Sequence, residues 1–172
     1  DFISTIAVRI LKEKIEAPPP PFTTSLLQPQ ASLRLHFSTK KTMMLAQQLY
    51  EGMDLPDEGT VGLITYMRTD SFRIADEAMT EIRSFVKQEF GEKYLEPLPR
   101  ITKSKKAAQD AHEAIRPSHV ERRPESLRSV LTPDQWKLYK MIWERVVATQ
   151  MKAAVYGVTE AQIKAGRARF SA

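Results

Sequence analysis

Alternating hydrophobic and polar positions at both ends of the chain predict β-strands there. In residues 2–16, apolar β-branched side chains recur at every second position, as Ile6, Val8 and Ile10. Residues 11–15 of this stretch fit a single helical turn equally well. A weaker alternation marks residues 154–170 as a further strand. Because two isolated strands are only marginally stable in water, we expect both ends to belong to a β-rich module that is only partly present.

The first half of the central region carries two helical patterns in close succession. Ser25 is the predicted N-cap of a helix that contains Pro29 near its start. After a short break, Ser38 or Thr39 caps a second helix that continues through Tyr50. Two helices separated by so few residues are typical of a helix-turn-helix. The residues expected to face the core include Leu26, Leu27, Leu33, Leu35, Met43 and Met44.

The second half of the central region contains two further helical patterns. Apolar residues recur at helical spacing over residues 76–90, and Gly91 provides a C-terminal stop. Thr132 and Gln135 form the pattern of a capping box, which begins a helix that ends near Met151. The aromatic residues of this helix have the spacing of a buried face, so we interpret them as core rather than as a platform for stacked bases. They are Trp136, Tyr139 and Trp143.

The segments between these elements suggest how the chain is divided. The prolines at residues 18–21 predict an extended spacer between modules, and the acidic, turn-rich residues 54–60 predict a loop. We therefore predict a mainly α fold with minor β: a helical domain containing helix-turn-helix-like elements, flanked by strands of a partial β-rich domain. The predicted parts are a first strand with its proline linker (residues 1–20), the helical domain (21–152) and a returning strand (153–172).

Composition narrows the classes of partner and chemistry. With 172 residues, of which 42% are hydrophobic, the chain can form a compact core. Its net charge of +5 favours a polyanionic partner such as nucleic acid. The absence of cysteine excludes disulfides, cysteine-ligated zinc, iron–sulfur clusters and thiol catalysis. No apolar run approaches the roughly 18 residues that span a bilayer, so we expect a soluble intracellular protein without membrane contact.

A basic cluster follows the helix predicted at residues 76–90. It consists of Arg100, Lys103, Lys105 and Lys106. We interpret this cluster as a solvated loop in preference to a phosphate contact, because runs of charge are usually solvated.

The strongest candidate for chemistry is the stretch of residues 62–71, which reads GLITYMRTDS. An apolar, strand-like run ends at Tyr66, and Arg68 follows two residues later. In an extended chain these two side chains project from the same face. A phenolic hydroxyl beside a guanidinium suits phosphodiester chemistry, because the hydroxyl can attack phosphorus while the guanidinium holds two phosphate oxygens.

Three further blocks occur in a fixed order around this stretch. They are PPFTTSLLQ at residues 20–28, KKTMMLAQQLYEG at 40–52 and AHEAIRP at 111–117. Together with residues 62–71, they resemble the type IA DNA topoisomerases, bacterial topoisomerase I among them. The resemblance covers about residues 18–156. It implies that the strands at the two ends belong to the β-rich arch domain of that family.

The resemblance implies roles for individual residues. Tyr66 matches the nucleophile that attacks a DNA phosphate and becomes a 5′-phosphotyrosine. Arg68 matches the arginine that steadies the scissile phosphate. His112, Arg116 and Thr69 match positions expected to bind DNA.

The resemblance also implies an activity for the whole enzyme. A type IA DNA topoisomerase is an isomerase that cleaves and rejoins one strand of negatively supercoiled DNA, acting on a single-stranded segment without ATP. The family's Mg²⁺ site lies on a toprim domain, and no Asp-x-Asp-x-Glu pattern occurs in this sequence. We therefore expect no metal or cofactor here, and we expect the fragment alone to bind DNA without relaxing it. The remaining domains of the enzyme are implied partners, the implied location is the bacterial cytoplasm at the nucleoid, and unpaired strands favour dimerisation.

Two alternatives remain open from the sequence. A non-catalytic helix-turn-helix module would read DNA through the second helix, which offers Lys40, Lys41, Gln47 and Gln48. A tyrosine recombinase or type IB-like enzyme would also use tyrosine, arginine and histidine. That class carries its tyrosine on a late helix and forms a 3′ linkage, whereas Tyr66 precedes His112 and follows a strand-like run.

Overall fold

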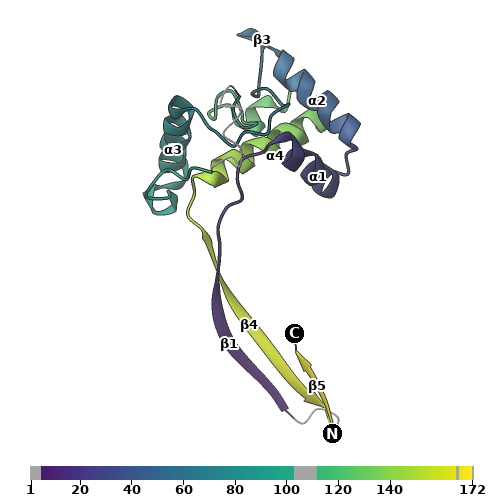
Figure 1. Ribbon diagram of the computed structural model, residues 1–172, viewed down its shortest axis with the longest axis vertical. Coiled ribbons are helices and arrows are strands. Elements are labelled where there is room, and N and C mark those ends of the chain that lie inside the picture. Colours follow the sequence, from purple (N-terminus) through teal and green to yellow (C-terminus); the bar gives the residue numbers. More distant parts are fainter. Residues whose placement is uncertain (1–4, 103–111, 166, 172) are drawn as a thin grey trace. The chain divides into compact units, whose positions relative to one another are not determined.

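The computed structural model describes residues 5–102, 112–165 and 167–171, which form two compact units (Figure 1). One unit combines the two ends of the chain, Asp1–Pro18 and Ala153–Ala172, and the other is Pro19–Lys152. Three lysines of the predicted basic cluster lie outside the described residues. They are Lys103, Lys105 and Lys106.

The unit formed by the chain ends is an antiparallel sheet with the strand order β1-β4-β5. Its strands are β1 (Thr5–Glu16), β4 (Ala154–Ala165) and β5 (Ala168–Ser171). The prediction of strands at both ends is therefore confirmed. The alternative of a helical turn over residues 11–15 is wrong, because these residues continue β1 and residues 12–15 pair with β4.

Large apolar side chains of this sheet remain exposed. They are Ile15, Val155, Tyr156, Val158 and Phe170. Sheets are normally stabilised by burying one face against another layer. We therefore expect this sheet to need a further layer before it is stable in water.

The larger unit is built from four α-helices within the described residues, which confirms the mainly α prediction. The helices are α1 (Thr24–Leu35), α2 (Thr39–Glu51), α3 (Asp76–Phe90) and α4 (Pro133–Thr149). Shorter elements are the strands β2 (Met53–Leu55) and β3 (Gly59–Val61) and the 3₁₀ turns η1 (Glu92–Tyr94) and η2 (Pro124–Leu127).

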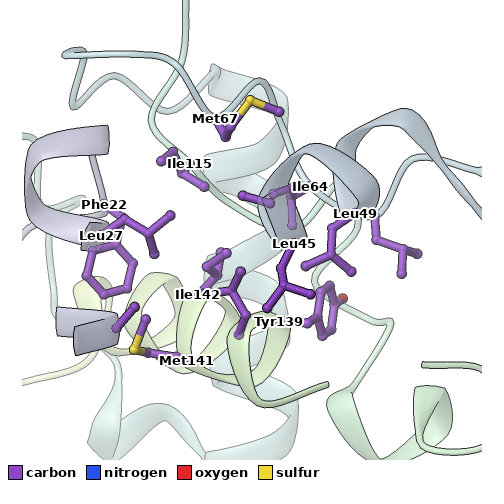
Figure 2. Packing of buried hydrophobic residues seen from close by; sticks show 14 of the residues in the cluster. Phe22, Leu27, Leu45, Leu49, Ile64, Met67, Ile115, Tyr139, Met141 and Ile142 are labelled. Atoms are coloured by element: carbon purple, nitrogen blue, oxygen red, sulfur yellow. The ribbon is translucent and has the colours of Figure 1, made fainter. Parts of the chain in front are cut away.

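Helix α4 is shared by two hydrophobic clusters, which makes it the centre of this unit. Its first half packs Tyr139 and Ile142 against α1 and α2, where Leu27, Leu45 and Leu49 are buried (Figure 2). Its last turns contribute to a second cluster with α3. The α3 side of that cluster contains Ile82, Phe85 and Val86, and the α4 side contains Val146 and Val147.

The polar atoms of the α4 aromatic residues are used inside the protein. Trp136 and Trp143 each donate from Nε1 to a backbone carbonyl at 2.7 Å. The hydroxyl of Tyr139 donates to the carbonyl of Arg122 at 2.6 Å, and burial raises the pKa of this phenol. Tyr139 is fully buried, and Trp136 and Trp143 are partly buried against the core, as the spacing predicts.

The helix starts agree only in part with the sequence patterns. Thr132 and Gln135 form the predicted capping box of α4, and Ser38 caps α2 by accepting from the backbone N–H of Lys41. The N-cap of α1 is Thr23 rather than Ser25, so that prediction is wrong. A tertiary contact fixes the helix start, because the N–H of Thr24 donates to the carbonyl of Thr69 at 2.9 Å.

Two predicted core residues lie at the surface. Leu33 is 71% exposed and Met44 is 52% exposed. Leu33 lies on the outer side of α1, where Leu27 is buried instead. Met44 lies on the outer side of α2, where Leu45 is buried instead. The sequence offered several leucines and methionines at similar spacing, and packing selected only some of them.

Two segments have different secondary structure from that predicted. Residues 54–60 are not an irregular loop, because β2 and β3 pair there in a short hairpin. The run before Tyr66 is not a strand, because it forms only an isolated bridge between Ile64 and Pro117. The apolar residues of this run are buried at Leu63 and Ile64, but they do not join a regular ladder.

Gly62 allows the end of α2 to approach the stretch that leads to Tyr66. The N–H of Leu63 donates to the carbonyl of Leu49 at 2.7 Å. A Cβ added at Gly62 would lie 2.7 Å from the carbonyl oxygen of Tyr50, which is closer than real Cβ contacts allow. The contact atom is backbone, so it cannot rotate away.

We expect Gly62→Ala to destabilise the helical unit by about 1–3 kcal/mol, because an overpacked contact forces the backbone to shift. Chemical denaturation followed by tryptophan fluorescence measures this, since Trp136 and Trp143 both lie on α4. Gly157→Ala is the matched control, because a Cβ there meets no atom within 4 Å. An unfolding midpoint for Gly62→Ala equal to that of the control would contradict the expectation.

Candidate active site

Three segments that are far apart in the sequence meet around Tyr66. They are residues 22–24, 62–73 and 112–118. Isolated β-bridges join them in pairs, Phe22 with Ile115 and Ile64 with Pro117. The buried residues Met67 and Ile115 anchor two of these segments in the core that Figure 2 shows. The sequence-predicted residues Tyr66, Arg68, Thr69, His112 and Arg116 all lie within these segments.

Burial alternates along the segment that carries Tyr66. The buried residues are Met67, Thr69 and Ser71. Tyr66 is half-buried, and Arg68 and Asp70 are exposed. Tyr66 and Arg68 thus share the outward side, as the two-residue spacing predicts, although the segment is not part of a strand.

The ring of Tyr66 contacts two other rings. The ring of Tyr50, from the end of α2, meets it edge-on, with centroids 5.4 Å apart and an interplanar angle of 67°. The ring of His112 meets it with centroids 5.4 Å apart at 32°. Two ring contacts restrict the rotation of the Tyr66 side chain, so the direction of the phenol is set by its neighbours.

Thr24, the first residue of α1, binds the backbone on both sides of Arg68. Its Oγ1 donates to the carbonyl of Met67 at 2.7 Å, with the carbonyl of Thr69 at 3.1 Å. The same Oγ1 accepts from the N–H of Thr69 at 3.0 Å. The peptide groups that flank Arg68 are therefore tied to the start of a helix.

Thr65 plays a similar part on the other side of Tyr66. Its Oγ1 donates to the carbonyl of Ala114 at 2.7 Å and accepts from the N–H of Arg116 at 3.0 Å. Its own N–H donates to the carbonyl of Arg116 at 2.9 Å. These bonds fix the segment of His112 beside the segment of Tyr66.

Glu113 and Arg116 form an ion pair at 2.5 Å with most of both side chains buried. Burial raises the pKa of the Glu113 carboxyl, but the hydrogen bond and charge of Arg116 lower it more. The backbone N–H of Ala75 and the charge of Arg73 lower it further, so its pKa lies below the usual value. The guanidinium of Arg116 also donates to the carbonyls of Pro117 and Ser118.

The predicted DNA-binding residues differ in how available they are. His112 is exposed beside Tyr66. Arg116 has a largely buried side chain with protein partners, and Thr69 is buried, with its Oγ1 accepting from the N–H of Ser71. These contacts hold Arg116 and Thr69 within the protein, and their binding to DNA stays a prediction. Among the described residues Arg68 makes no ion pair, so its guanidinium is available for a phosphate.

Sequence reasoning missed three residues that build the site: Tyr50, Thr24 and Thr65. Tyr50 was interpreted only as part of a helix face, and the hydroxyls near residue 24 only as caps. The sequence could have pointed to all three, because each lies within one of the blocks that carry the resemblance. Their long-range partners are 43 to 51 residues away for the two threonines, which no local pattern reveals.

Metal clusters and membrane-spanning helices are two further features that bear on function. In the part of the chain that the structure describes, no group of three or more His, Asp or Glu side chains could hold a metal ion. None of the helices within the described ranges is long and apolar enough to cross a membrane.

Comparisons with known proteins identify the family. The family model described as DNA topoisomerase matches residues 4–172. A solved structure of full-length topoisomerase I from Thermotoga maritima is similar to this chain, with 42% identity and a TM-score of 0.75. That match covers 99% of this chain and 26% of the Thermotoga protein, so this chain spans about a quarter of that length. With the site geometry, the ordered blocks and the family match in agreement, the chain belongs to the type IA DNA topoisomerases and represents a segment of such an enzyme.

Proposed function

We propose that this chain carries the nucleophilic half of a type IA topoisomerase active site, in which Tyr66 attacks DNA and Arg68 holds the attacked phosphate. The observation that carries the proposal is the outward-facing pair itself. The ring of Tyr66 contacts the rings of Tyr50 and His112, and Arg68 is exposed two residues away without an ion pair in the described residues. His112, exposed against the Tyr66 ring, is the proposed direct DNA contact.

The proposed reaction exchanges one phosphodiester for another. The Tyr66 hydroxyl loses its proton and its oxygen bonds to phosphorus, while the bond from phosphorus to the 3′ oxygen of the preceding nucleotide breaks. That oxygen gains a proton, and the DNA is left with a 5′-phosphotyrosine and a free 3′-hydroxyl. The reverse step rejoins the strand, so no ATP is consumed. Arg68 can donate two parallel hydrogen bonds to the non-bridging oxygens, where negative charge gathers during transfer.

The metal and proton-transfer groups are proposed to lie on the toprim domain of the full enzyme. The described residues of this chain do not fit Mg²⁺, since they offer no cluster of three acidic or histidine ligands. We therefore derive no step through the metal here. The chain's own contribution is the nucleophile, the phosphate clamp and the scaffold that orients them.

The wider activity of the whole protein follows the same proposal. The enzyme acts on a single-stranded segment of negatively supercoiled DNA in the bacterial cytoplasm, at the nucleoid. Residues 1–20 and 153–172 are the strands through which the chain joins the β-rich arch domain, and residues 21–152 are the tyrosine-bearing domain. The fragment alone binds DNA, favoured by its net charge of +5, without relaxing it, and its exposed strands favour dimerisation.

The non-catalytic helix-turn-helix alternative is less consistent with the contacts of α2. Lys41 is paired with Asp134 of α4 at 2.6 Å. Gln48 accepts a hydrogen bond from Gln135 of α4 at 3.0 Å, and Gln47 donates to Glu51 within α2. Three of the four side chains that this alternative assigns to DNA therefore already have partners within the protein. Helix α2 therefore serves to place Tyr50 beside Tyr66.

Tyr66→Phe in the full-length protein should abolish covalent capture of DNA, because the ring remains but the attacking oxygen is gone. Protein-linked DNA on a denaturing gel, with the label at each DNA end in turn, measures both capture and linkage. We expect the wild-type link at the 5′ end. Tyr94→Phe makes the same chemical change at an exposed tyrosine outside the site. Capture by Tyr66→Phe would overturn the nucleophile assignment, and a 3′ link would favour the recombinase-like class.

Arg68→Ala should slow single-turnover cleavage by about 10²–10³-fold, the usual cost of losing one group that stabilises developing charge. Arg68→Lys should recover part of the rate, because lysine keeps the charge and lacks the bidentate fork. Arg128→Ala is the control, since that guanidinium lies over the ring of Trp136 instead. Rates for Arg68→Ala and the control that agree within about twofold would remove the clamp from the proposal.

The ion pair of Glu113 and Arg116 should make the helical unit acid-sensitive. Because the folded-state pKa of Glu113 is lowered, its contribution to stability is present above the usual value of 4.5 and is lost as the pH falls through the folded pKa. Glu113→Gln should lose about 1–3 kcal/mol at pH 7 and vary less below about pH 5. Denaturant titrations at several pH values measure both effects. Parallel pH profiles for the two proteins would contradict this expectation.

A further inference from the structure

We propose that Thr24 is a positioning residue for DNA cleavage, acting through Arg68. This inference rests on the proposed function of Arg68 as the phosphate clamp. Within the described residues, the hydroxyl of Thr24 bonds to the backbone of Met67 and Thr69, and not to the side chain of Tyr66 or Arg68.

The hydrogen bonds of Thr24 reach the backbone on both sides of Arg68. Its hydroxyl donates to the residue before Arg68, at the Met67 carbonyl, and accepts from the residue after it, at the Thr69 N–H. The backbone N–H of Thr24 also donates to the Thr69 carbonyl at 2.9 Å. Both peptide groups that determine where the Cα of Arg68 lies, and where its Cβ points, are therefore bound to one residue.

Arg68 needs this support because nothing in the described structure holds its guanidinium. The side chain is exposed and makes no ion pair within the described residues. Arg116, by comparison, is fixed by a carboxylate and two carbonyls. The position of the Arg68 guanidinium therefore depends on its backbone, and a displacement of about 1 Å at a reacting phosphate can cost about a hundredfold in rate.

Thr24 is itself held firmly enough to act as a support. It begins α1 and follows Phe22 and Thr23, which are buried. The carbonyl of Phe22 accepts from the N–H of Ile115 at 2.8 Å, which ties the same stretch to the His112 segment. Leu27, one turn into α1, is buried in the main core. A support of this kind transmits little motion to the residue that it positions.

The test compares variants of Thr24 in the full-length protein. Thr24→Val keeps the shape and removes the hydroxyl, Thr24→Ala removes it with less bulk, and Thr24→Ser keeps it. Single-turnover cleavage is measured at saturating DNA, and DNA affinity is measured separately. We expect Thr24→Val to slow cleavage about ten- to a hundredfold with affinity changed less than about threefold, and Thr24→Ser to restore most of the rate. Thr80→Val is the matched control, because the Thr80 hydroxyl also donates to a backbone carbonyl, that of Asp76 in α3.

A double-mutant cycle separates positioning from a merely structural role. If Thr24 acts through Arg68, then Thr24→Val should have no further effect on cleavage in an Arg68→Ala background. If the two substitutions slow cleavage independently, so that their fold-effects multiply in the double variant, the inference is overturned. Cleavage at the wild-type rate by both Thr24→Val and Thr24→Ala would overturn it as well. Should Thr24→Val fail to fold, the cycle is run with Thr24→Ala and judged by the same outcomes. A wild-type protein that never links to DNA through Tyr66 would instead defeat the proposed function.

Discussion

The site depends on threonine hydroxyls that join segments without forming a sheet. Around Tyr66 the chain makes isolated bridges only, so regular ladders do not fix the three segments. Thr24 and Thr65 replace them, each donating to one carbonyl and accepting from one N–H across more than 40 residues of sequence. A hydroxyl can do both at once, which a backbone group cannot. Tyr66 and Arg68, the proposed reacting residues, can therefore face outward while their neighbours remain bonded within the protein.

The sequence predicted the elements far better than their contacts. Helical spacing located α3 and α4, and the capping box at Thr132 located the start of α4, because these signals are local. The start of α1 was misplaced because a long-range bond from Thr24 decides it. Leu33 and Met44 were assigned to the core because spacing alone cannot say which of several apolar residues faces inward.

Within the site, too, local spacing was predicted from the sequence and long-range contacts were not. Tyr66 and Arg68 were found from a spacing of two residues, and burial places them on one side as expected. Arg116 and Thr69 were assigned to DNA from their place in the blocks, whereas the structure shows protein partners for both side chains. No sequence pattern distinguishes Arg68, which is exposed without an ion pair in the described residues, from Arg116, which is paired with Glu113. That difference lies in tertiary contacts.

The ring contacts of Tyr66 would also act after the proposed cleavage of the DNA strand. The rings of Tyr50 and His112 both contact the ring of Tyr66. If Tyr66 becomes a phosphotyrosine as proposed, the same contacts would restrict its movement. The captured DNA end would then keep its position relative to this unit. Rejoining requires the 3′-hydroxyl to meet the same phosphorus again. The ring contacts would therefore serve the fidelity of resealing as much as the rate of attack.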